Sequence, residues 1–566
     1  MAMQVSLGPY RAAVDAALSE IRTQKIAERI WAHDHTVWKP KPAEISNRLG
    51  WLDIAERLAG DLSQINKLVE SVRSQGYINA VLLGMGGSSL APEVFRKTFG
   101  VTTGFLDLRV ADSTDPQAIR DQTNRVDLGK TLFIVSTKSG GTVETLSLFK
   151  YFFKQVAAGA GTANAGKHFI AITDPGSSLL KLAERFGFRD TFVNDPNIGG
   201  RYSALSYFGL VPAALIGADL KKLLQRAGTA SSGCRRQQPS GSDCCPGVRL
   251  GAIIGELAKA GRDKVTIICS PALASFGDWA EQLIAESTGK ERKGILPVVG
   301  EPLGSPDVYG DDRLFISLSL GGDTTHDEDL KALEDAGHPT VRLALNDRYD
   351  IGGEFFRWEM ATAIAGYRLG INPFDQPNVE AAKVLAREMV GSYLSTGELP
   401  VLTPAFESNG IEVYSDLGGG TLSGALNSLL DGALPGAYIS IQAYIQPTAN
   451  TDEALQSLRT RLRYRTQLAT TVGYGPRFLH STGQLHKGDG GKGLFIQLCA
   501  DDTSDADIPD EPGSAASSIS FGVLKEAQAL GDRQALIDAG RQVIRFHLGR
   551  HVVGGIKTLT DAISRT

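Results

Sequence analysis

The spacing of apolar residues divides the chain into a helical beginning and a long stretch in which strands and helices alternate. Between residue 9 and about residue 75, apolar positions such as Leu18, Ile21 and Ile26 recur at near-helical spacing, which predicts helices. From residue 79 onward, short apolar runs are each followed by Gly or Ser and then by a helical stretch. This order is typical of buried parallel strands that alternate with helices.

Two tandem α/β units are predicted from this pattern. The expected strands of the first unit are NAVLLG from residue 79, LRVAD from 108, TLFIVS from 131 and HFIAIT from 168. Those of the second unit are KVTIICS from 264, LFISLSL from 314 and TVRLAL from 340. We therefore expect an α/β fold with two doubly wound parallel-sheet domains, an N-terminal helical segment and a C-terminal α+β region.

Changes in composition set the expected boundaries. The segment from Gly228 to Pro246 is rich in Gly, Ser and Pro and has no periodicity, which predicts a loop or linker. The predicted division is 1–78 for the helical segment, 79–227 for the first α/β domain, 228–247 for the linker, 248–394 for the second α/β domain and 395–566 for the C-terminal region.

The overall composition is that of an ordinary globular protein and argues against several functions. The chain has 566 residues and a formal net charge of -5, which offers no general attraction for nucleic acid or an anionic membrane. No apolar run reaches the roughly 18 residues of a membrane span, and the N-terminus lacks a signal-peptide pattern. Five cysteines are too few for a disulfide framework. We expect a cytoplasmic protein that binds neither nucleic acid nor membrane.

Two strand–helix turns have the composition of phosphate-binding loops. The first, GMGGSSL, places Gly87 and Ser88 at the start of a helix, where free N–H groups and the positive end of the helix dipole suit a phosphate. For this motif alone, a tight turn without a ligand is an equally good interpretation. The second turn, STKSGGTVET, gathers hydroxyl groups around Lys138. Two such turns on nearly the same sheet edge favour a phosphate site.

Two further residues are candidates for contacts with a ligand. In the motif IGGRYSALS, paired glycines bring backbone N–H groups and the guanidinium of Arg201 to one point, where they would stabilise an oxyanion. A structural salt bridge is the alternative interpretation. Glu144, one helical turn beyond the second loop, would contact a sugar or Lys138, or else lie on a solvated helix face.

Together these motifs resemble the phosphoglucose isomerase family. The resemblance depends on GMGGSSLAP, STKSGGTVET, IGGRYSALSYFG, AESTGK and NPFDQPNVEAAK, which occur in this order along residues 84–383. The region beyond residue 395 looks more like the isomerase part of fusions with transaldolase. The resemblance implies two sugar isomerase (SIS) domains, a small sugar-phosphate substrate, no cofactor, no metal and a homodimer.

The resemblance also implies roles for individual residues. Glu286 matches the catalytic base of the family, Arg201 matches the Arg beside that base, and Lys383 matches the active-site Lys. The implied substrate-binding positions are Gly87, Ser88, Thr137, Lys138, Ser139, Thr142, Glu144, Gly200, Gln282 and Gln376.

The activity that the resemblance implies is the interconversion of glucose 6-phosphate and fructose 6-phosphate. One carboxylate would move a proton between C2 and C1 of a cis-enediol, and partial desolvation of Glu286 would raise its pKa toward the working pH. Two alternatives stay open: an isomerase that also accepts mannose 6-phosphate, and a non-catalytic SIS-type protein that binds a sugar phosphate. The sequence contains no basic recognition helix, which disfavours a sensor of the kind tied to DNA binding.

One catalytic group of the family has no match in this chain. The family uses a His for opening the sugar ring, in a segment after Gly-Glu-Pro, but the segment GEPLGSPDVYGDDR that starts at Gly300 contains none. The candidates for this role are Asp311, Asp312, Lys383, His480 and His486, and a purely structural role is the alternative interpretation of the two histidines. Glu407, in FESNG, also resembles the base motif of the family, but we reject it because the family's base precedes the Lys at 383.

Overall fold

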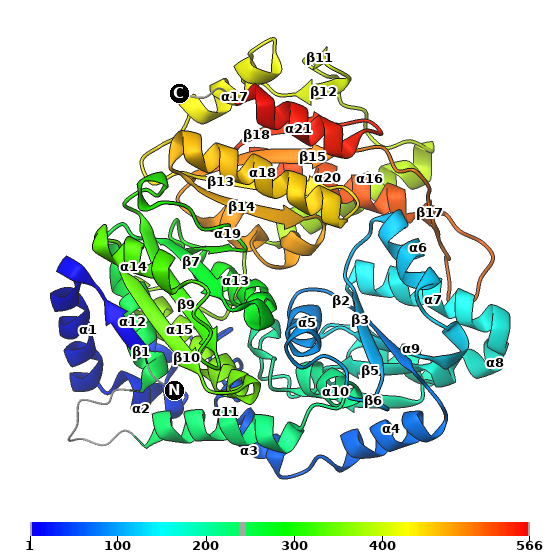
Figure 1. Cartoon of the computed structure of the whole chain (residues 1–566). Helices are drawn as coiled ribbons and strands as arrows, with labels where there is room; N and C mark the ends of the chain where they lie inside the picture. Colours follow the sequence, from blue (N-terminus) through cyan, green and yellow to red (C-terminus); the bar gives the residue numbers. More distant parts are fainter. Residues whose placement is uncertain (1–2, 237–244, 564–566) are drawn as a thin grey trace.

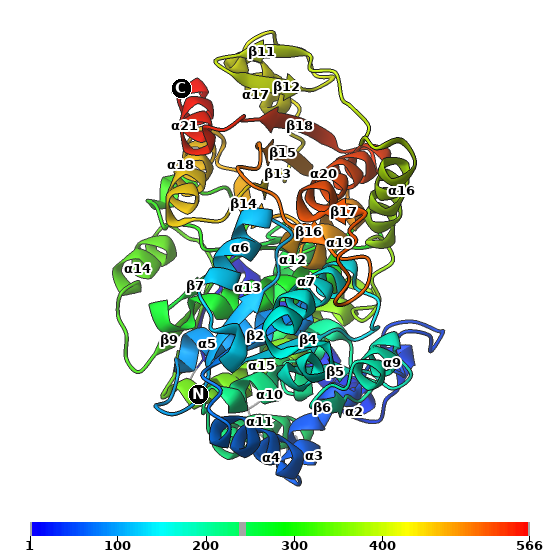
Figure 2. The same ribbon diagram turned by 90° about the vertical axis from the view of Figure 1, so that its right-hand side faces the viewer.

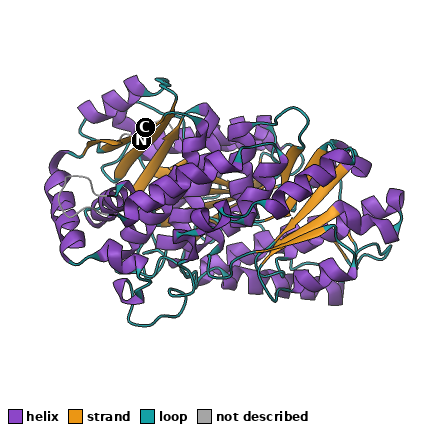
Figure 3. Cartoon of the chain, turned by 90° about the horizontal axis from the view of Figure 1, so that it is seen from below, coloured by secondary structure: helices purple, strands orange, loops and turns teal. Residues whose placement is uncertain are grey.

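The computed structural model describes residues 3–236 and 245–563, and these form three α/β units around a common centre (Figure 1). The first unit lies at the lower right of that view, the second at the lower left and the third at the top. In each unit helices cover a sheet, which Figure 3 shows from below. The prediction of an α/β fold with parallel sheets is confirmed.

The first sheet consists of five parallel strands in the order β3-β2-β4-β5-β6. Its strands are β2 (Asn79–Gly84), β3 (Asp107–Ala111), β4 (Thr131–Ser136), β5 (Phe169–Thr173) and β6 (Asp190–Val193). Its helices are α5 (Gly87–Phe99), α6 (Pro116–Asn124), α7 (Val143–Ala160), α8 (Thr162–Ala165), α9 (Ser178–Arg185) and α10 (Tyr207–Leu215). The strand order reverses between β2 and β4, the point where open parallel sheets bind ligands. Both predicted phosphate loops follow these two strands.

The second sheet has the order β1-β10-β9-β7-β8. Its strands are β1 (Met3–Ser6), β7 (Lys264–Cys269), β8 (Leu296–Val299), β9 (Arg313–Leu320) and β10 (Thr340–Leu345). Its helices are α12 (Pro246–Lys259), α13 (Ala274–Thr288), α14 (Asp327–Asp335) and α15 (Ile351–Leu369). The N-terminal segment is helical after residue 8, and it begins with the strand β1, which the sequence analysis does not predict and which pairs antiparallel with β10. A strand of four residues is too short to give an alternating pattern in the sequence.

The helices that precede and join these two units run along their outer side. They are α1 (Arg11–Thr23), α2 (Ile26–Trp31), α3 (Ile54–Ala59), α4 (Ser63–Ser74) and α11 (Leu220–Arg235). The first two sheets and these helices share one continuous hydrophobic core. Among the described residues, no helix is long and apolar enough to cross a membrane.

The third sheet has the order β11-β12-β18-β15-β13-β14. Its strands are β11 (Phe406–Ser408), β12 (Ile411–Tyr414), β13 (Tyr438–Tyr444), β14 (Ala469–Tyr474), β15 (Gly493–Cys499) and β18 (Gln542–His547), and a separate pair is β16 (Asp507–Ile508) with β17 (Ile519–Ser520). Its helices are α16 (Glu380–Thr396), α17 (Leu422–Asp431), α18 (Ala449–Thr466), α19 (Gly483–Gly488), α20 (Phe521–Asp538) and α21 (Val552–Ala562).

The third unit repeats the topology of the second. In each, the first parallel strand has the second on one side and the third and fourth on the other, and antiparallel pairing follows at the edge next to the fourth strand. The region that the sequence predicts only as α+β is therefore a further doubly wound unit. It has its own core, and smaller apolar clusters join it to the other two units below it in Figure 2.

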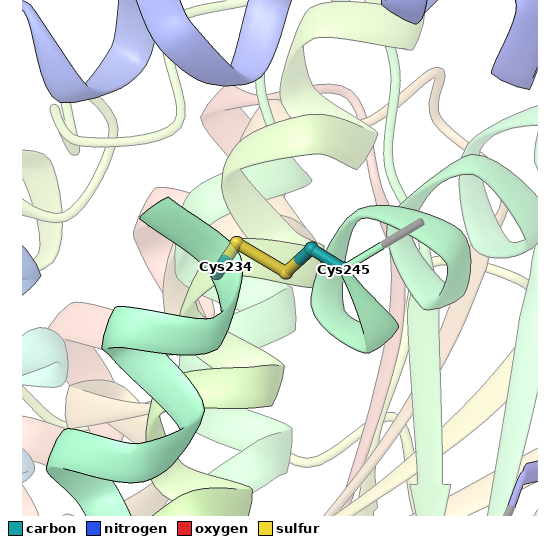
Figure 4. The surroundings of a disulfide bond; sticks show 2 residues. All are labelled: Cys234 and Cys245. Carbon is teal, nitrogen blue, oxygen red and sulfur yellow. A yellow bond between two sulfur atoms is a disulfide. The ribbon is translucent and has the colours of Figure 1, made fainter. Parts of the chain in front are cut away.

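The predicted linker is helical over its first part. Helix α11 continues to Arg235 because Ala227, Ser231 and Cys234 are buried at helical spacing, a pattern that the Ser and Gly content hides. Cys234 also forms a disulfide with Cys245, a single pairing that the cysteine count does not predict (Figure 4). The rest of the predicted linker, residues 237–244, lies outside the described residues.

Candidate active site

A cavity of about 1010 Å³ lies where the three units meet. Its walls are the turns after β2 and β4, the second half of α13, the beginning of α16, and residues of α19 and α20. The predicted site residues that line it are Gly87, Ser88, Lys138, Ser139, Thr142, Glu144, Gly200, Arg201, Gln282, Glu286, Gln376 and Lys383. Thr137 is buried behind this lining, with its hydroxyl 2.8 Å from that of Thr142.

Close backbone packing joins the first phosphate-type loop to the turn that carries Arg201. A Cβ atom on Gly87 would lie 2.0 Å from the carbonyl oxygen of Gly200, so only glycine allows the two turns to approach this closely. The preceding Gly86 has φ +56°, which favours glycine as well. The two turns that contain the GMGGSS and GGRYS motifs are therefore packed directly against each other.

In the second phosphate-type loop, the cationic side chain of Lys138 is paired with a carboxylate. The Nζ atom of Lys138 forms an ion pair with Asp174, which follows β5, and lies 3.3 Å from the carbonyl oxygen of Pro196. Lys138 does not pair with Glu144, so one of the predicted contacts is wrong. Lys138, Ser139 and Thr142 all line the cavity beside the N-terminus of α7.

Glu286 lies on α13 with its side chain buried in the cavity wall, at a relative exposure of 5%. Its Oε2 atom is 3.3 Å from a terminal nitrogen of Arg201, and its Oε1 atom accepts a 3.4 Å hydrogen bond from Gln282. Burial raises the pKa of this carboxyl, and the positive charge of Arg201 opposes part of that rise. Glu286 is thus a desolvated carboxylate at the edge of the cavity.

All five N–H donors of Arg201 bind acceptors within the chain. Its Nε donates to Ser287, and its two terminal nitrogens donate to Glu286, to the Oε1 of Gln376 and to two backbone carbonyls. A guanidinium has five such donors, so none is left for a substrate oxygen. Arg201 therefore acts by its charge and by holding Glu286 and the segment before α16 in place. The predicted direct contact with an oxyanion would require one of these bonds to break.

A chain of hydrogen bonds crosses from the first unit to the third. Nε2 of His480 lies 2.9 Å from Oε1 of Glu144, and the same oxygen accepts a 2.7 Å hydrogen bond from Gln528 on α20. Burial acts to raise the pKa of Glu144, but His480 outweighs it and lowers the pKa below its usual value. The carboxylate only accepts, so Nε2 of His480 carries the proton in this arrangement.

Lys383 is the most solvent-exposed of the three predicted catalytic residues. It lies on α16, lines the cavity and pairs with Glu380 at 3.0 Å. The segment before this helix is held more firmly, because the buried Lys290 pairs with Asp375 at 2.8 Å and Arg201 binds Gln376. Burial lowers the pKa of Lys290 to about 8.

The other candidates for ring opening lie away from the cavity. Asp311 is fully exposed and faces Arg262 at 3.7 Å, whereas Asp312 faces Lys264. His486 is buried beneath Tyr438, 3.0 Å from its hydroxyl. Of the five candidates, only His480 and Lys383 line the cavity. Glu407, which the sequence analysis rejects as the base, is an exposed residue of β11.

Sequence reasoning missed the polar residues that the third unit adds. Gln528 binds Glu144, and Lys487, which also lines the cavity, pairs with Asp532 at 2.6 Å. It also missed Asp174, the partner of Lys138. No local motif marks Gln528 or Lys487, and only the position of Asp174 at the end of a predicted strand is a usable signal.

The fold and the cavity have the layout of α/β proteins that bind anionic ligands beyond the carboxyl ends of their strands. The sequence pattern of the phosphoglucose isomerase family matches residues 53–291. The glucose-6-phosphate isomerase of Bacillus cytotoxicus is 30% identical over 393 residues, which span 59% of this chain and 85% of the relative. That of Rubrobacter xylanophilus is 30% identical over 376 residues, spanning 57% and 85%. This chain belongs to the phosphoglucose isomerase family, as the resemblance predicts.

Solved structures agree with this assignment at the level of the fold. A hypothetical protein from Thermus thermophilus is 25% identical with a TM-score of 0.58, and the match covers 68% of this chain and 99% of that one. A glucose-6-phosphate isomerase from Chlamydia trachomatis is 22% identical with a TM-score of 0.50, over 66% of this chain and 78% of that one.

Proposed function

We propose that this chain interconverts glucose 6-phosphate and fructose 6-phosphate through a cis-enediol. The observation that carries the proposal is the position of Glu286, a buried carboxylate with a raised pKa at the wall of the large cavity. Such a base is suited to taking a proton from one carbon and returning it to the next. Membership of the phosphoglucose isomerase family supports the same reaction.

A coupled assay tests this activity directly. Fructose 6-phosphate is supplied without added metal, and formation of glucose 6-phosphate is followed with a dehydrogenase. The absence of product at high enzyme concentration would contradict the proposal. The same assay with mannose 6-phosphate decides whether the second sugar is also accepted, and binding of either sugar without turnover would favour the non-catalytic alternative.

The sugar's phosphate would bind at the two loops that follow β2 and β4. Hydroxyl groups of Ser88, Ser139 and Thr142, the ammonium of Lys138 and the N-terminus of α7 line that side of the cavity. Neutral donors and one cation bind a phosphate without a strongly basic protein. Contacts remote from the reacting carbons let binding energy orient C1 and C2 against Glu286.

Lys138→Ala is expected to raise the KM for fructose 6-phosphate by about 10- to 100-fold, the value of one hydrogen bond to a charged group. The phosphate contact is made in the ground state and the transition state alike, so kcat should change little. Initial-rate kinetics measure both constants. Lys181→Ala, an exposed residue of α9, is the matched control. An unchanged KM in Lys138→Ala would argue against the phosphate site.

His480 would open the sugar ring by exchanging a proton with the ring oxygen. Its Nε2 is engaged by Glu144, so Nδ1 is the nitrogen that would reach the substrate. Glu144 and Gln528 act as positioning residues, because they hold the imidazole ring at the cavity wall. Lys383 is the competing candidate for the same role.

His480→Gln is expected to lower the enzyme-catalysed exchange between the α and β anomers of glucose 6-phosphate by about 10²-fold or more, the usual contribution of a general acid. Anomer exchange requires ring opening but no proton transfer at carbon, so exchange NMR separates the two steps. Glu286→Gln should keep this exchange. If Lys383→Ala lost it and His480→Gln did not, Lys383 would be the ring-opening group.

A homodimer and a cytoplasmic location complete the proposal, and both are supported by the family resemblance. Structural disulfides are rare in a reducing compartment, so the disulfide between Cys234 and Cys245 is the one observation that opposes the cytoplasmic location. The described cavity draws its walls from three units of one chain.

A further inference from the structure

A second cavity, of about 390 Å³, lies between the second and third units. Its lining contains six cationic side chains, which are Lys259, Lys264, Arg292, Lys293, Arg368 and Lys492. Two carboxylates, Asp263 and Asp489, lie among them. The volume falls in the range of small-molecule sites, roughly 300–1,000 Å³. Such an excess of positive charge is local, because the whole chain carries a formal charge of -5.

Ion pairs within the protein neutralise part of this charge. Asp263 pairs with Lys264 and lies 3.4 Å from Lys492. Glu256, just outside the lining, holds Arg368 at 2.6 Å and Lys259 at 3.1 Å. These four cations therefore have internal carboxylate partners.

Arg292 and Lys293 have no carboxylate within ion-pair distance in the part of the chain that the structure describes. Both residues are exposed and line the cavity, and the side chain of Lys293 donates only to the carbonyl oxygen of Leu369, at 2.6 Å. The guanidinium of Arg292 makes no hydrogen bond to any described residue. Two adjacent cations thus keep their charge available to a ligand.

Residues 290–293 form a tight two-residue turn, which the N–H of Lys293 closes by donating to the carbonyl oxygen of Lys290 at 2.9 Å. Glu291 and Arg292 have φ of 55° and 63°, in the left-handed region that costs an ordinary residue about 1–2 kcal/mol. The N–H of Arg292 donates to the carbonyl oxygen of Gly488 at 3.0 Å, which holds the turn against the third unit. The turn therefore fixes the backbone of Arg292 beside the cavity.

We propose that this cavity binds a small molecule with two phosphate groups. Arg292 and Lys293 come from the second unit and Lys492 from the third, so cations face the cavity from both sides. A guanidinium binds phosphate oxygens in a bidentate manner, and a lysine adds a point charge. A bisphosphate would lie between the two units and join them.

The bound anion would also affect the candidate active site, an effect that rests on the proposed isomerase function. Helix α13 carries Glu286 and ends at Thr288, four residues before Arg292. Helix α19 follows His480 and ends at Gly488, the acceptor of the Arg292 N–H. The ligand would therefore bind close to the C-terminal ends of α13, which carries Glu286, and of α19, which begins three residues after His480.

Isothermal titration with pyrophosphate, at about 0.15 M salt, tests the binding. The wild-type chain, Arg292→Ala/Lys293→Ala and a charge-matched control, Lys67→Ala/Lys221→Ala, are compared; both control residues are exposed and lie outside the cavity. We expect affinity about tenfold weaker in the first double variant and unchanged in the control. Lys138→Ala, a change in the large cavity, should leave pyrophosphate binding in the second cavity unchanged. This variant therefore separates binding in the two cavities.

Equal affinity in all variants, or an equal loss in both double variants, would overturn the site. Thermal unfolding checks that the exposed substitutions leave the fold intact. Lys492→Glu tests the opposite wall and should also weaken pyrophosphate. Inorganic phosphate should bind more weakly than pyrophosphate, and equal affinity for the two would overturn the bisphosphate assignment.

Kinetics test the coupling separately from the binding. Pyrophosphate should change kcat at saturating fructose 6-phosphate in the wild type, and this change should vanish in Arg292→Ala/Lys293→Ala. Purely competitive inhibition that persists in the double variant would overturn the coupling. If the chain showed no isomerase activity at all, the titration would still decide the binding site, so failure of the two proposals is distinguishable.

Discussion

Glu286→Gln is expected to lower kcat for the conversion of fructose 6-phosphate to glucose 6-phosphate by about 10²–10⁴-fold, the usual contribution of a general base. The amide has nearly the same shape but cannot take up a proton. The phosphate loops lie on another wall of the cavity, so the Kd for fructose 6-phosphate should stay within about threefold, as titration calorimetry would measure. Turnover close to the wild-type rate would remove Glu286 from the mechanism.

Glu281→Gln is a matched control for this substitution. Glu281 lies on the same helix and is half-buried, with a pKa that desolvation raises to about 8. It binds Ser481 at 3.2 Å but does not line the cavity. We expect the activity of the Glu281→Gln variant to remain within about threefold of that of the wild type. Equal losses in the two variants would indicate damage to the helix rather than loss of a base.

Arg201→Met is expected to reduce both the stability and the activity of the protein strongly. The substitution leaves Glu286 buried without its cation, and breaking a buried pair in this way costs about 3–5 kcal/mol of unfolding free energy. Chemical denaturation measures this loss. Arg201→Lys keeps the charge but supplies at most three of the five donors, so we expect an intermediate result. Unchanged stability in both variants would contradict the positioning role.

The pH dependence of Arg201→Met distinguishes this role from a merely structural one. Arg201 opposes the rise in the pKa of Glu286, so its removal should raise that pKa further and move the acid limb of kcat/KM to higher pH. A carboxyl whose pKa is raised on folding adds stability below its unfolded pKa, and this is lost as the pH rises through the folded pKa. The destabilisation should therefore be larger near pH 8 than near pH 4.

Arg313→Met provides the comparison. Arg313 is buried on β9 and pairs with Glu301 at 3.1 Å, and neither residue lines the large cavity. Its loss should destabilise the chain to a similar degree but leave the acid limb of kcat/KM in place. An equal shift of the limb in both variants would show that the shift follows from general loosening.

Local patterns explain which features could be predicted from the sequence. A strand, a glycine-rich turn and a helix are neighbours in the chain, so both phosphate-type loops and the parallel sheets follow from spacing alone. Arg201 and Glu286 are 85 residues apart, and their contact is set by tertiary packing that no periodicity encodes. Only the family resemblance predicts that Arg201 lies beside Glu286.

The contributions of the third unit are harder to predict for the same physical reason. His480 and Gln528 lie 336 and 384 residues from Glu144, and the three side chains meet because separate sheets pack against each other. The strand order of the third sheet also cannot be predicted from the sequence pattern. Its edge strands β11 and β12 have only three and four residues, too few for alternation to be recognised.

The meeting of three units at one cavity has a consequence for how the protein loses its function. Because each unit contributes a wall of the cavity, partial unfolding of any one unit would open the cavity to solvent, even while the other two units stay folded. Inactivation on heating should therefore follow the least robust of the three parts rather than the average of the whole chain.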